Sequence, residues 1–229
     1  MAAMTTTTDT AATLRLLAWL SPAFPTGGYA YSHGLEWAIE TNDITDGATL
    51  RAWIDTIIRR GAGRSDAILL RHAHRAANDI AALQTLNELA LAACPSRERQ
   101  AESIGQGNAF RLAAAPWQPD NLRRLAVLTP DIAYPVAIGA LAGAQHIPED
   151  MACAGALQAF VANLISAAVR LVPLGQSTGL AVLAALEPAI TETAEATRHA
   201  TRDDLGGACF RSDLASLRHE TQYTRLFRS

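Results

Sequence analysis

A serine between two glycines is the pattern in this 229-residue chain that comes nearest to a catalytic nucleophile. Residues 175–179 read GQSTG, and Asp203 or Asp204 and then His219 follow in the chain order of α/β-hydrolase triads. Such a serine needs a preceding strand and a supporting sheet, whereas an alanine-rich helical segment precedes Ser177. A helix start is therefore the favoured interpretation, and a serine hydrolase using Ser177 is the alternative.

Histidine spacing argues against a metal site. His72 and His74 are two residues apart, so on a helix their rings would point about 200° apart and could not share one ion. Neither has a cysteine or carboxylate three or four residues later, and the other histidines are isolated in the sequence. We expect no catalytic residue, no bound metal and no cofactor.

The composition excludes several classes of protein. All 19 basic residues are arginine, so the chain lacks the lysine of a phosphate-binding loop, of a Schiff base or of a lysine base. A net charge of −3 argues against a basic nucleic-acid groove. The three cysteines, Cys94, Cys153 and Cys209, are an odd number and widely spaced, which suits a reducing compartment. The expected location is the cytoplasm.

The hydrophobic period is helical along most of the chain. Apolar residues recur at i, i+3, i+4, i+7 and i+8 from Leu50 to Ile58, and more loosely from Ile80 to Ala90. Gly139 and Gly143 would share one helical face and allow close helix packing. Strand signals are sparse. The pattern predicts an all-α, alanine-rich, single-domain bundle of roughly eight to eleven helices.

Local signals place several helix boundaries. Pro119 and Pro148, each followed by acidic residues, mark first turns, and Ser212 is a candidate N-cap of a last helix. Ser32 would cap a helix that follows a loop rich in proline and glycine. Residues 151–169 carry no charge and are long enough to span a membrane. Their alanine content and polar side chains favour a buried central helix instead.

We expect three segments along the chain. Residues 1–12 are predicted to be a disordered tail, 13–222 the helical domain and 223–229 a partner-binding tail. In that last segment Tyr223, Leu226 and Phe227 have helical i, i+3, i+4 spacing, with arginines between them. Either the segment folds back on its own core or it fills another protein's groove. The second interpretation is favoured, because aromatic and arginine side chains are typical interface anchors.

Three sequence segments together resemble the urease accessory protein F (UreF) family. They are LLAWLSPAFPTGGYAYSHGLEWAIE near the start, VPLGQSTG in the late middle and QYTRLFRS at the end. Their order and spacing match the family, although Phe24 and Tyr29 stand where the family often carries other apolar or aromatic residues. The family places GQSTG in a helical context, which argues further against the hydrolase.

The resemblance implies a non-enzymatic, all-α scaffold. Members form homodimers, bind UreD (UreH in some organisms) and recruit the GTPase UreG to apo-urease for nickel insertion, with an influence on GTP hydrolysis. No nucleic acid or membrane is expected among the partners. The UreD-binding region would comprise the helix over residues 212–220 and the tail residues Tyr223, Arg225, Leu226, Phe227, Arg228 and Ser229. The family motif and assembly surface would comprise Pro25, Gly27, Gly28, Tyr31, Ser32, His33, Gly34, Glu36, Gly175 and Gln176.

Overall fold

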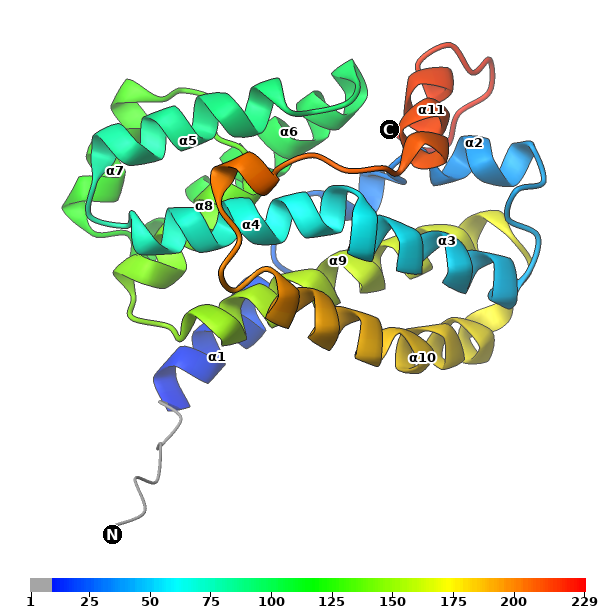
Figure 1. Ribbon diagram of the computed structural model, residues 1–229, viewed down its shortest axis with the longest axis horizontal. Coiled ribbons are helices and arrows are strands. Elements are labelled where there is room, and N and C mark those ends of the chain that lie inside the picture. Colours follow the sequence, from blue (N-terminus) through cyan, green and yellow to red (C-terminus); the bar gives the residue numbers. More distant parts are fainter. Residues whose placement is uncertain (1–9) are drawn as a thin grey trace, which may run out of the picture.

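A computed structural model describes residues 10–229, and in this part of the chain all regular secondary structure is helical, without a strand (Figure 1). The all-α prediction is confirmed. Eleven α-helices and three short 3₁₀ helices follow one another in this order: α1 (Thr10–Trp19), η1 (Gly28–Ala30), α2 (Leu35–Glu40), α3 (Gly47–Arg60), α4 (Ala62–Arg75), α5 (Ile80–Ala92), α6 (Arg97–Ala113), η2 (Ala115–Trp117), α7 (Asp120–Leu128), α8 (Tyr134–Ala144), α9 (Glu149–Leu171), α10 (Gly175–Ala196), η3 (Arg202–Asp204) and α11 (Phe210–His219).

Helix α9 runs through the middle of the bundle and contacts α2, α3, α4, α8 and α10. Within residues 10–229 it is the one helix long and apolar enough to cross a membrane. The same test is passed by core helices of water-soluble proteins. Eight of its residues are buried in the fold, among them Cys153, Val161 and Leu164, which agrees with the predicted central helix.

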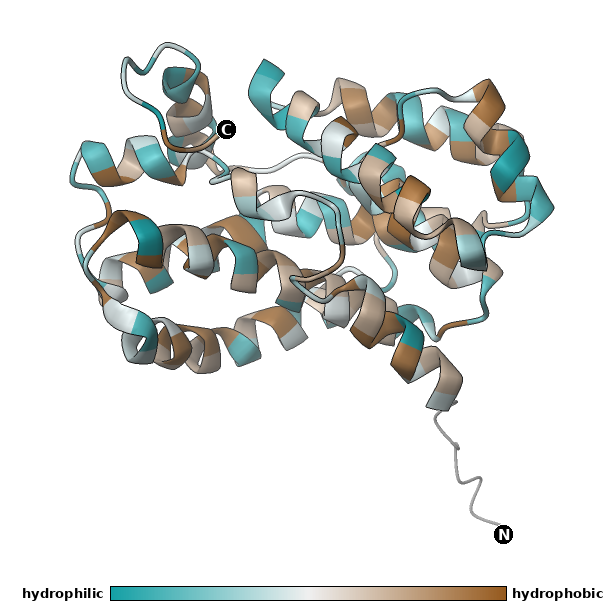
Figure 2. Ribbon diagram, turned by 180° about the vertical axis from the view of Figure 1, so that it is seen from behind, coloured by the Kyte–Doolittle hydropathy of each residue, from teal (hydrophilic) through white to brown (hydrophobic). Residues whose placement is uncertain are grey.

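The periodic segments form the predicted helices. In α3 the side chains of Leu50, Ile54, Ile57 and Ile58 are buried, because residues three and four apart lie on one helical face. Apolar and polar residues also alternate along many of the other helices (Figure 2). Pro119 and Pro148 are the N-cap residues of α7 and α9.

Helices α4 and α8 make the most extensive helix–helix contact in the bundle, and two glycines allow it. A Cβ atom added at Gly139 would lie 2.2 Å from the carbonyl oxygen of Leu70, and one at Gly143 equally close to that of His74. Both glycines face α4, as their four-residue spacing predicted. No other residue type would fit at this backbone separation.

A buried arginine joins the centre of the bundle to its outer helices. Arg71 of α4 is 1% exposed; it pairs with Glu149 of α9 at 2.6 Å and donates to the carbonyl oxygen of Ala194 in α10 at 2.7 Å. Such a charge is tolerated in a core only when its donors are satisfied. The contacts fix α4, α9 and α10 relative to one another.

Three predicted boundaries are wrong. Helix α1 begins at Thr10, so residues 10–12 are helical and not part of a tail; residues 1–9 lie outside the described part of the chain. The N-cap of α11 is Cys209, and Ser212 is buried inside the helix. The N-cap position of α2 is Gly34 and not Ser32, although the Ser32 hydroxyl still accepts the backbone N–H of Glu36 in the first turn at 3.3 Å and also donates to the carbonyl oxygen of Ser229. Short polar residues are good caps, but tertiary contacts decide these positions.

Candidate protein-binding site

Residues 222–229 fold back onto the chain, the first of the two interpretations given above, and form no helix. The segment is anchored through its backbone: the N–H groups of Leu226 and Phe227 donate to the two carboxylate oxygens of Glu36 at 2.7 and 2.9 Å. The N–H of Arg228 donates to the carbonyl oxygen of Ala30 at 2.9 Å. The predicted helical spacing is therefore incidental, since the donors that a helix would use internally go to α2 and η1.

Ser229 lies completely buried beneath the motif of residues 25–36. Its carbonyl oxygen accepts hydrogen bonds from both the backbone N–H (2.9 Å) and the hydroxyl of Ser32. Its own hydroxyl donates to Glu102 Oε2 of α6 at 2.6 Å. The two ends of the sequence that carry the family motifs are thus joined directly.

Phe227 is packed inside its own chain. It is 4% exposed, and the guanidinium of Arg170, near the end of α9, lies 4.5 Å from the centre of its ring. A cation over an aromatic face adds to the gain from burial. The interpretation that Phe227 itself fills a partner's pocket does not fit this placement. The neighbouring Tyr223 and Leu226 are exposed and available instead.

A buried histidine connects α11 to the same anchor. His219 is fully buried; its Nδ1 lies 2.6 Å from Glu98 Oε2 and its Nε2 3.3 Å from Glu36 Oε2. Arg225 of the tail donates to the other oxygen of Glu98 at 2.8 Å. Glu36 and Glu98 therefore each bridge α11 and the tail.

A second buried group of charges lies under the motif. His33 is buried, and its burial lowers its pKa to about 4, so that the ring is uncharged at neutral pH. Burial opposes the ionisation of Glu102, but Arg99 and His33 outweigh it and hold the pKa of that carboxyl below its usual range. Arg99 pairs with Glu102 within α6. Nearby, burial raises the pKa of Asp66 to about 6.

The motif's backbone explains its glycines. His33 and Gly34 have φ values of +61° and +76°, and a Cβ at Gly34 would lie 2.7 Å from the backbone nitrogen of Ser216 in α11. Gly27 also has a positive φ, a conformation that glycine adopts without penalty. The chain reversal at Gly34 lets α11 pack directly on α2.

The remaining motif residues divide between buried and exposed positions. Tyr31 is half-buried beside α6, whereas Tyr29 is 71% exposed. Pro25 is exposed and Gly28 is partly buried. Gly175 and Gln176 are exposed at the start of α10, a helix that packs on α3, α4 and α9 and not on this motif.

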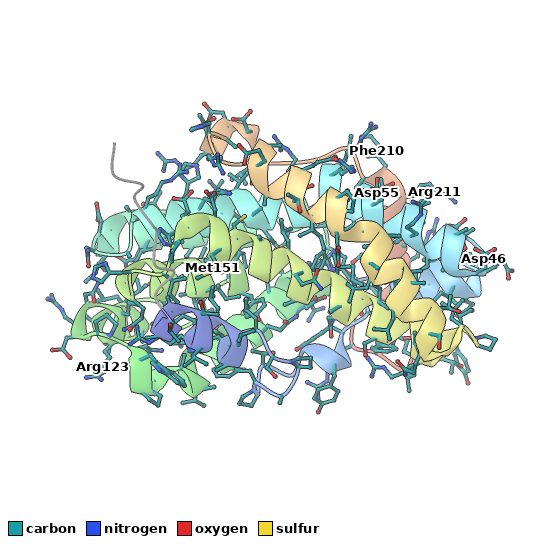
Figure 3. The ribbon with its side chains drawn as sticks, turned by 90° about the horizontal axis from the view of Figure 1, so that it is seen from below. Asp46, Asp55, Arg123, Met151, Phe210 and Arg211 are labelled. Carbon is teal, nitrogen blue, oxygen red and sulfur yellow. The ribbon has the colours of Figure 1, made fainter. Side chains whose placement is uncertain are left out.

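One face of α11 and the adjacent tail present large apolar side chains to solvent. We call this surface the α11 face; Figure 3 shows its first residue, Phe210, with Arg211 at the edge of the molecule. Exposed apolar patches of this kind mark interaction sites. The α11 face consists of Phe210 (75% exposed), Leu214 (53%), Leu217 (47%), Tyr223 (fully exposed) and Leu226 (66%).

The geometry does not support the hydrolase alternative. Ser177 lies in the first turn of α10, and no strand precedes it in the described part of the chain. His219, the base of the supposed triad, has both ring nitrogens against Glu98 and Glu36. An elbow nucleophile needs the strained strand-to-helix turn that is missing here.

A large cavity lies beside α9, and no metal-binding cluster accompanies it. The cavity has a volume of about 950 Å³ and is lined mainly by α1, α4, α6, α8, α9 and α10, with Asp66 and Glu102 on its wall. Among residues 10–229, no three His, Cys, Asp or Glu side chains are grouped so as to hold a metal ion. The arrangement as a whole is suited to binding.

Comparison with known proteins decides the family. The UreF family model matches residues 44–187. A urease accessory protein UreF of Bradyrhizobium sp. (strain ORS 278) is 52% identical over 224 residues, which is 96% of this chain and 93% of that protein. The chain belongs to the UreF family. A UreF of Methylorubrum populi is 51% identical, over 94% of this chain and 98% of that protein. The family consists of non-catalytic urease accessory proteins that take part in urease maturation.

Sequence reasoning missed several residues of the site. Glu98, Arg99 and Glu102 lie on one side of α6 and have no distinguishing local pattern. Arg170 directly follows the uncharged residues 151–169, and nothing in its neighbourhood in the sequence points to Phe227. The exposed positions of α11 did give a signal, since Phe210, Leu214 and Leu217 are spaced as one helical face. The deciding information is that these side chains stay exposed in the part of the chain that the structure describes.

Proposed function

We propose that this chain is a scaffold for urease maturation that binds UreD (UreH) through the α11 face and recruits the GTPase UreG to apo-urease for nickel insertion. The observation that carries the proposal is the α11 face itself, an exposed apolar surface held in place by buried hydrogen bonds to Glu36 and Ser32. A surface prepared in this way loses little conformational entropy on binding.

The charges around the α11 face indicate the chemistry of the partner. Arg218 and Arg228 are exposed beside the apolar side chains. Arginine next to aromatic residues is enriched at binding hot spots. The complementary surface on UreD would be apolar at its centre and acidic at its rim.

A homodimer is the second part of the proposal. Along α9, residues Gly155, Ala159 and Ala162 remain partly exposed, and less than half of its most apolar stretch is buried. Leu14 and Leu17 of the adjoining α1 are also exposed. A second copy of the chain would cover this surface. Such a dimer would hold two UreG subunits, so that GTP hydrolysis and contact with urease become linked through differential affinity.

The proposed setting is the cytoplasm, where ureases and their GTPase would meet the scaffold without a membrane or nucleic acid. The scaffold's own side chains would make or break no bond. Any influence on GTP hydrolysis would act through the position of UreG.

Point variants of exposed residues test the proposal without disturbing the fold. Leu214→Asp and Leu226→Asp place a charge in the α11 face, and Leu112→Asp makes the same change at an exposed position of α6. We expect the first two to weaken UreD binding by about tenfold or more, as losses at an interface hot spot do. Leu112→Asp should bind normally. Equal binding by all three, measured by calorimetry with purified UreD, contradicts the proposal.

A further inference from the structure

The cavity beside α9 has enclosed hydrogen-bond donors on its wall that find no acceptor among residues 10–229. Arg99 of α6 lines the cavity and is 7% exposed. Its Nε and Nη1 make no hydrogen bond, although Nη1 pairs electrostatically with Glu102. Trp19 of α1, on the same wall, is 1% exposed, and its indole N–H also lacks an acceptor. Enclosed donors of this kind are costly unless something in the cavity accepts from them.

A carboxyl group without a hydrogen bond lies beside Arg99. Asp66 of α4 lines the cavity and is close enough to Arg99 and Glu102 for their charges to influence its pKa. In the described part of the chain no group donates a hydrogen bond to it. Glu102, by contrast, accepts from Gln106 at 3.2 Å and from Ser229 at 2.6 Å. Asp66 is thus a free acceptor next to the free donor of Arg99.

The charges at this point of the wall restrict what can bind there. Arg99 and Glu102 balance each other and burial keeps His33 uncharged, so an ionised Asp66 is the unbalanced group. An anion would add a second negative charge. A cation would leave the N–H groups of Arg99 and Trp19 without an acceptor. The ligand that fits is uncharged and carries both an acceptor and an N–H donor.

A bound metal ion does not fit this wall either. Among residues 10–229, no three His, Cys, Asp or Glu side chains are grouped so as to hold one. Two carboxyl groups, one of them already paired with Arg99, are too few protein ligands for a closed site.

Most of the remaining wall is apolar. Leu16 and Leu20 of α1, Leu70 of α4, Ile138 of α8 and Leu157 of α9 all line the cavity. Its volume of about 950 Å³ lies within the range of small-molecule sites, which combine an apolar wall with a few convergent polar groups. There is room for a compact hydrocarbon group attached to the polar head.

We propose that the cavity binds an uncharged carboxamide with an apolar body. The carbonyl oxygen accepts from the guanidinium of Arg99, and the amide N–H donates to the carboxyl of Asp66. The apolar body packs against the leucines of α1 and α4. No residue of the α11 face lines the cavity, so this site does not depend on the proposed function.

Nuclear magnetic resonance of the ¹⁵N-labelled full chain, in the oligomeric state that it adopts in solution, tests the proposal with benzamide as the probe. Acetophenone keeps the ring and the carbonyl acceptor but has a methyl group in place of the NH₂. Benzoate keeps the ring and carries a negative charge. The indole N–H of Trp19 and the backbone amides of Gly63 and Ala67 report binding, since these residues line the cavity. The indole N–H of Trp53 is the control, because it is enclosed without an acceptor outside the cavity.

We expect benzamide to shift the three cavity signals saturably, with a dissociation constant of about 1 mM, and to leave the Trp53 signal in place. Acetophenone and benzoate should each bind at least about tenfold more weakly, because the first cannot donate to Asp66 and the second is repelled by it. No saturable shift, as when water or a second copy of the chain fills the cavity, overturns the proposal. So does acetophenone or benzoate that binds as tightly as benzamide.

A variant pair gives a second test. Asp66→Ala removes the acceptor, and Asp203→Ala makes the same change at an exposed position outside the cavity. We expect Asp66→Ala to weaken benzamide binding about tenfold and to leave acetophenone binding unchanged, whereas Asp203→Ala should affect neither. Unchanged benzamide affinity in a folded Asp66→Ala chain contradicts the proposal. Should that variant not fold, the comparison of the three probes on the unmodified chain decides.

Discussion

Two regions of the molecule are stabilised by different means. One is the contact between α4 and α8, and the other is the docking of residues 222–229 on α2 and α6. At the first, glycines let two helix backbones touch, and Gly139 and Gly143 leave no room for a methyl group. At the second, backbone N–H groups and charged side chains converge on Glu36, Glu98 and Glu102. Close packing tolerates no rearrangement, whereas hydrogen bonds to charged groups can be exchanged with water. The helix contact at the centre is therefore rigid, whereas the contacts of residues 222–229 can adjust.

The largest effect should come from filling the gap between α4 and α8. Gly139→Ala puts a Cβ atom 2.2 Å from the carbonyl oxygen of Leu70, a rigid backbone atom that cannot turn away. Separating the helices should cost about 3 kcal/mol of unfolding free energy, measured by urea denaturation.

Gly155→Ala is the matched control. Its added Cβ would meet only the flexible end of Leu20 at 2.8 Å, and alanine is the better helix former by about 1 kcal/mol. We expect little change or a slight gain in stability. A Gly139→Ala chain as stable as the Gly155→Ala chain would mean that the central helices can move apart freely.

Truncating the tail's buried aromatic ring should have a local effect of similar size, confined to the tail. Phe227→Ala removes a side chain that is 4% exposed, and such changes cost about 3 kcal/mol or more. Since the tail can open without global unfolding, the loss should appear as faster amide exchange in residues 222–229. Leu226→Ala, at a 66% exposed position, should leave exchange unchanged. Similar behaviour of both variants argues against the docked arrangement.

The buried histidine of the motif should give a smaller, pH-dependent effect. Because its pKa falls from 6.5 to about 4 on folding, the unfolded chain takes up a proton between these values and the folded chain does not. Stability is therefore lost as pH falls through that window. His33→Asn, which tolerates the positive φ, should remove about 2 kcal/mol of this loss. Urea denaturation at pH 4.5 and 7 measures it, and an unchanged pH slope contradicts the prediction.

Asp66 should produce the smallest effect, with the opposite sign. Its pKa rises from 3.8 to about 6 on folding, so the folded chain binds a proton first and stability falls as pH rises through that range. Because Asp66 is only partly buried and solvent screens it, Asp66→Asn should be more stable than the unmodified chain by about 1 kcal/mol at pH 8, less than the full pKa shift would give. The difference should vanish near pH 4. A difference that is equal at both pH values would indicate a packing effect instead.

The sequence predicted the rigid helix packing better than the docking of residues 222–229. The apolar period of α3 and the glycine pair of α8 are local patterns with one structural solution, and both predictions are confirmed. The sequence does not show how the tail docks, because the i, i+3, i+4 spacing of Tyr223, Leu226 and Phe227 does not reveal that the segment is irregular and that only Phe227 of these three is buried. The anchors Glu36 and Glu98 come from helices far apart in the sequence, and no local signal joins them.

Hydrogen–deuterium exchange of this chain with and without purified UreD tests most directly whether the molecule acts through the α11 face. We predict slower exchange in α11 and residues 222–229 on complex formation. In α4 and α8 we predict no change, because close packing already protects their amides. Unchanged exchange in α11 and residues 222–229 in a complex shown to have formed would contradict the central claim.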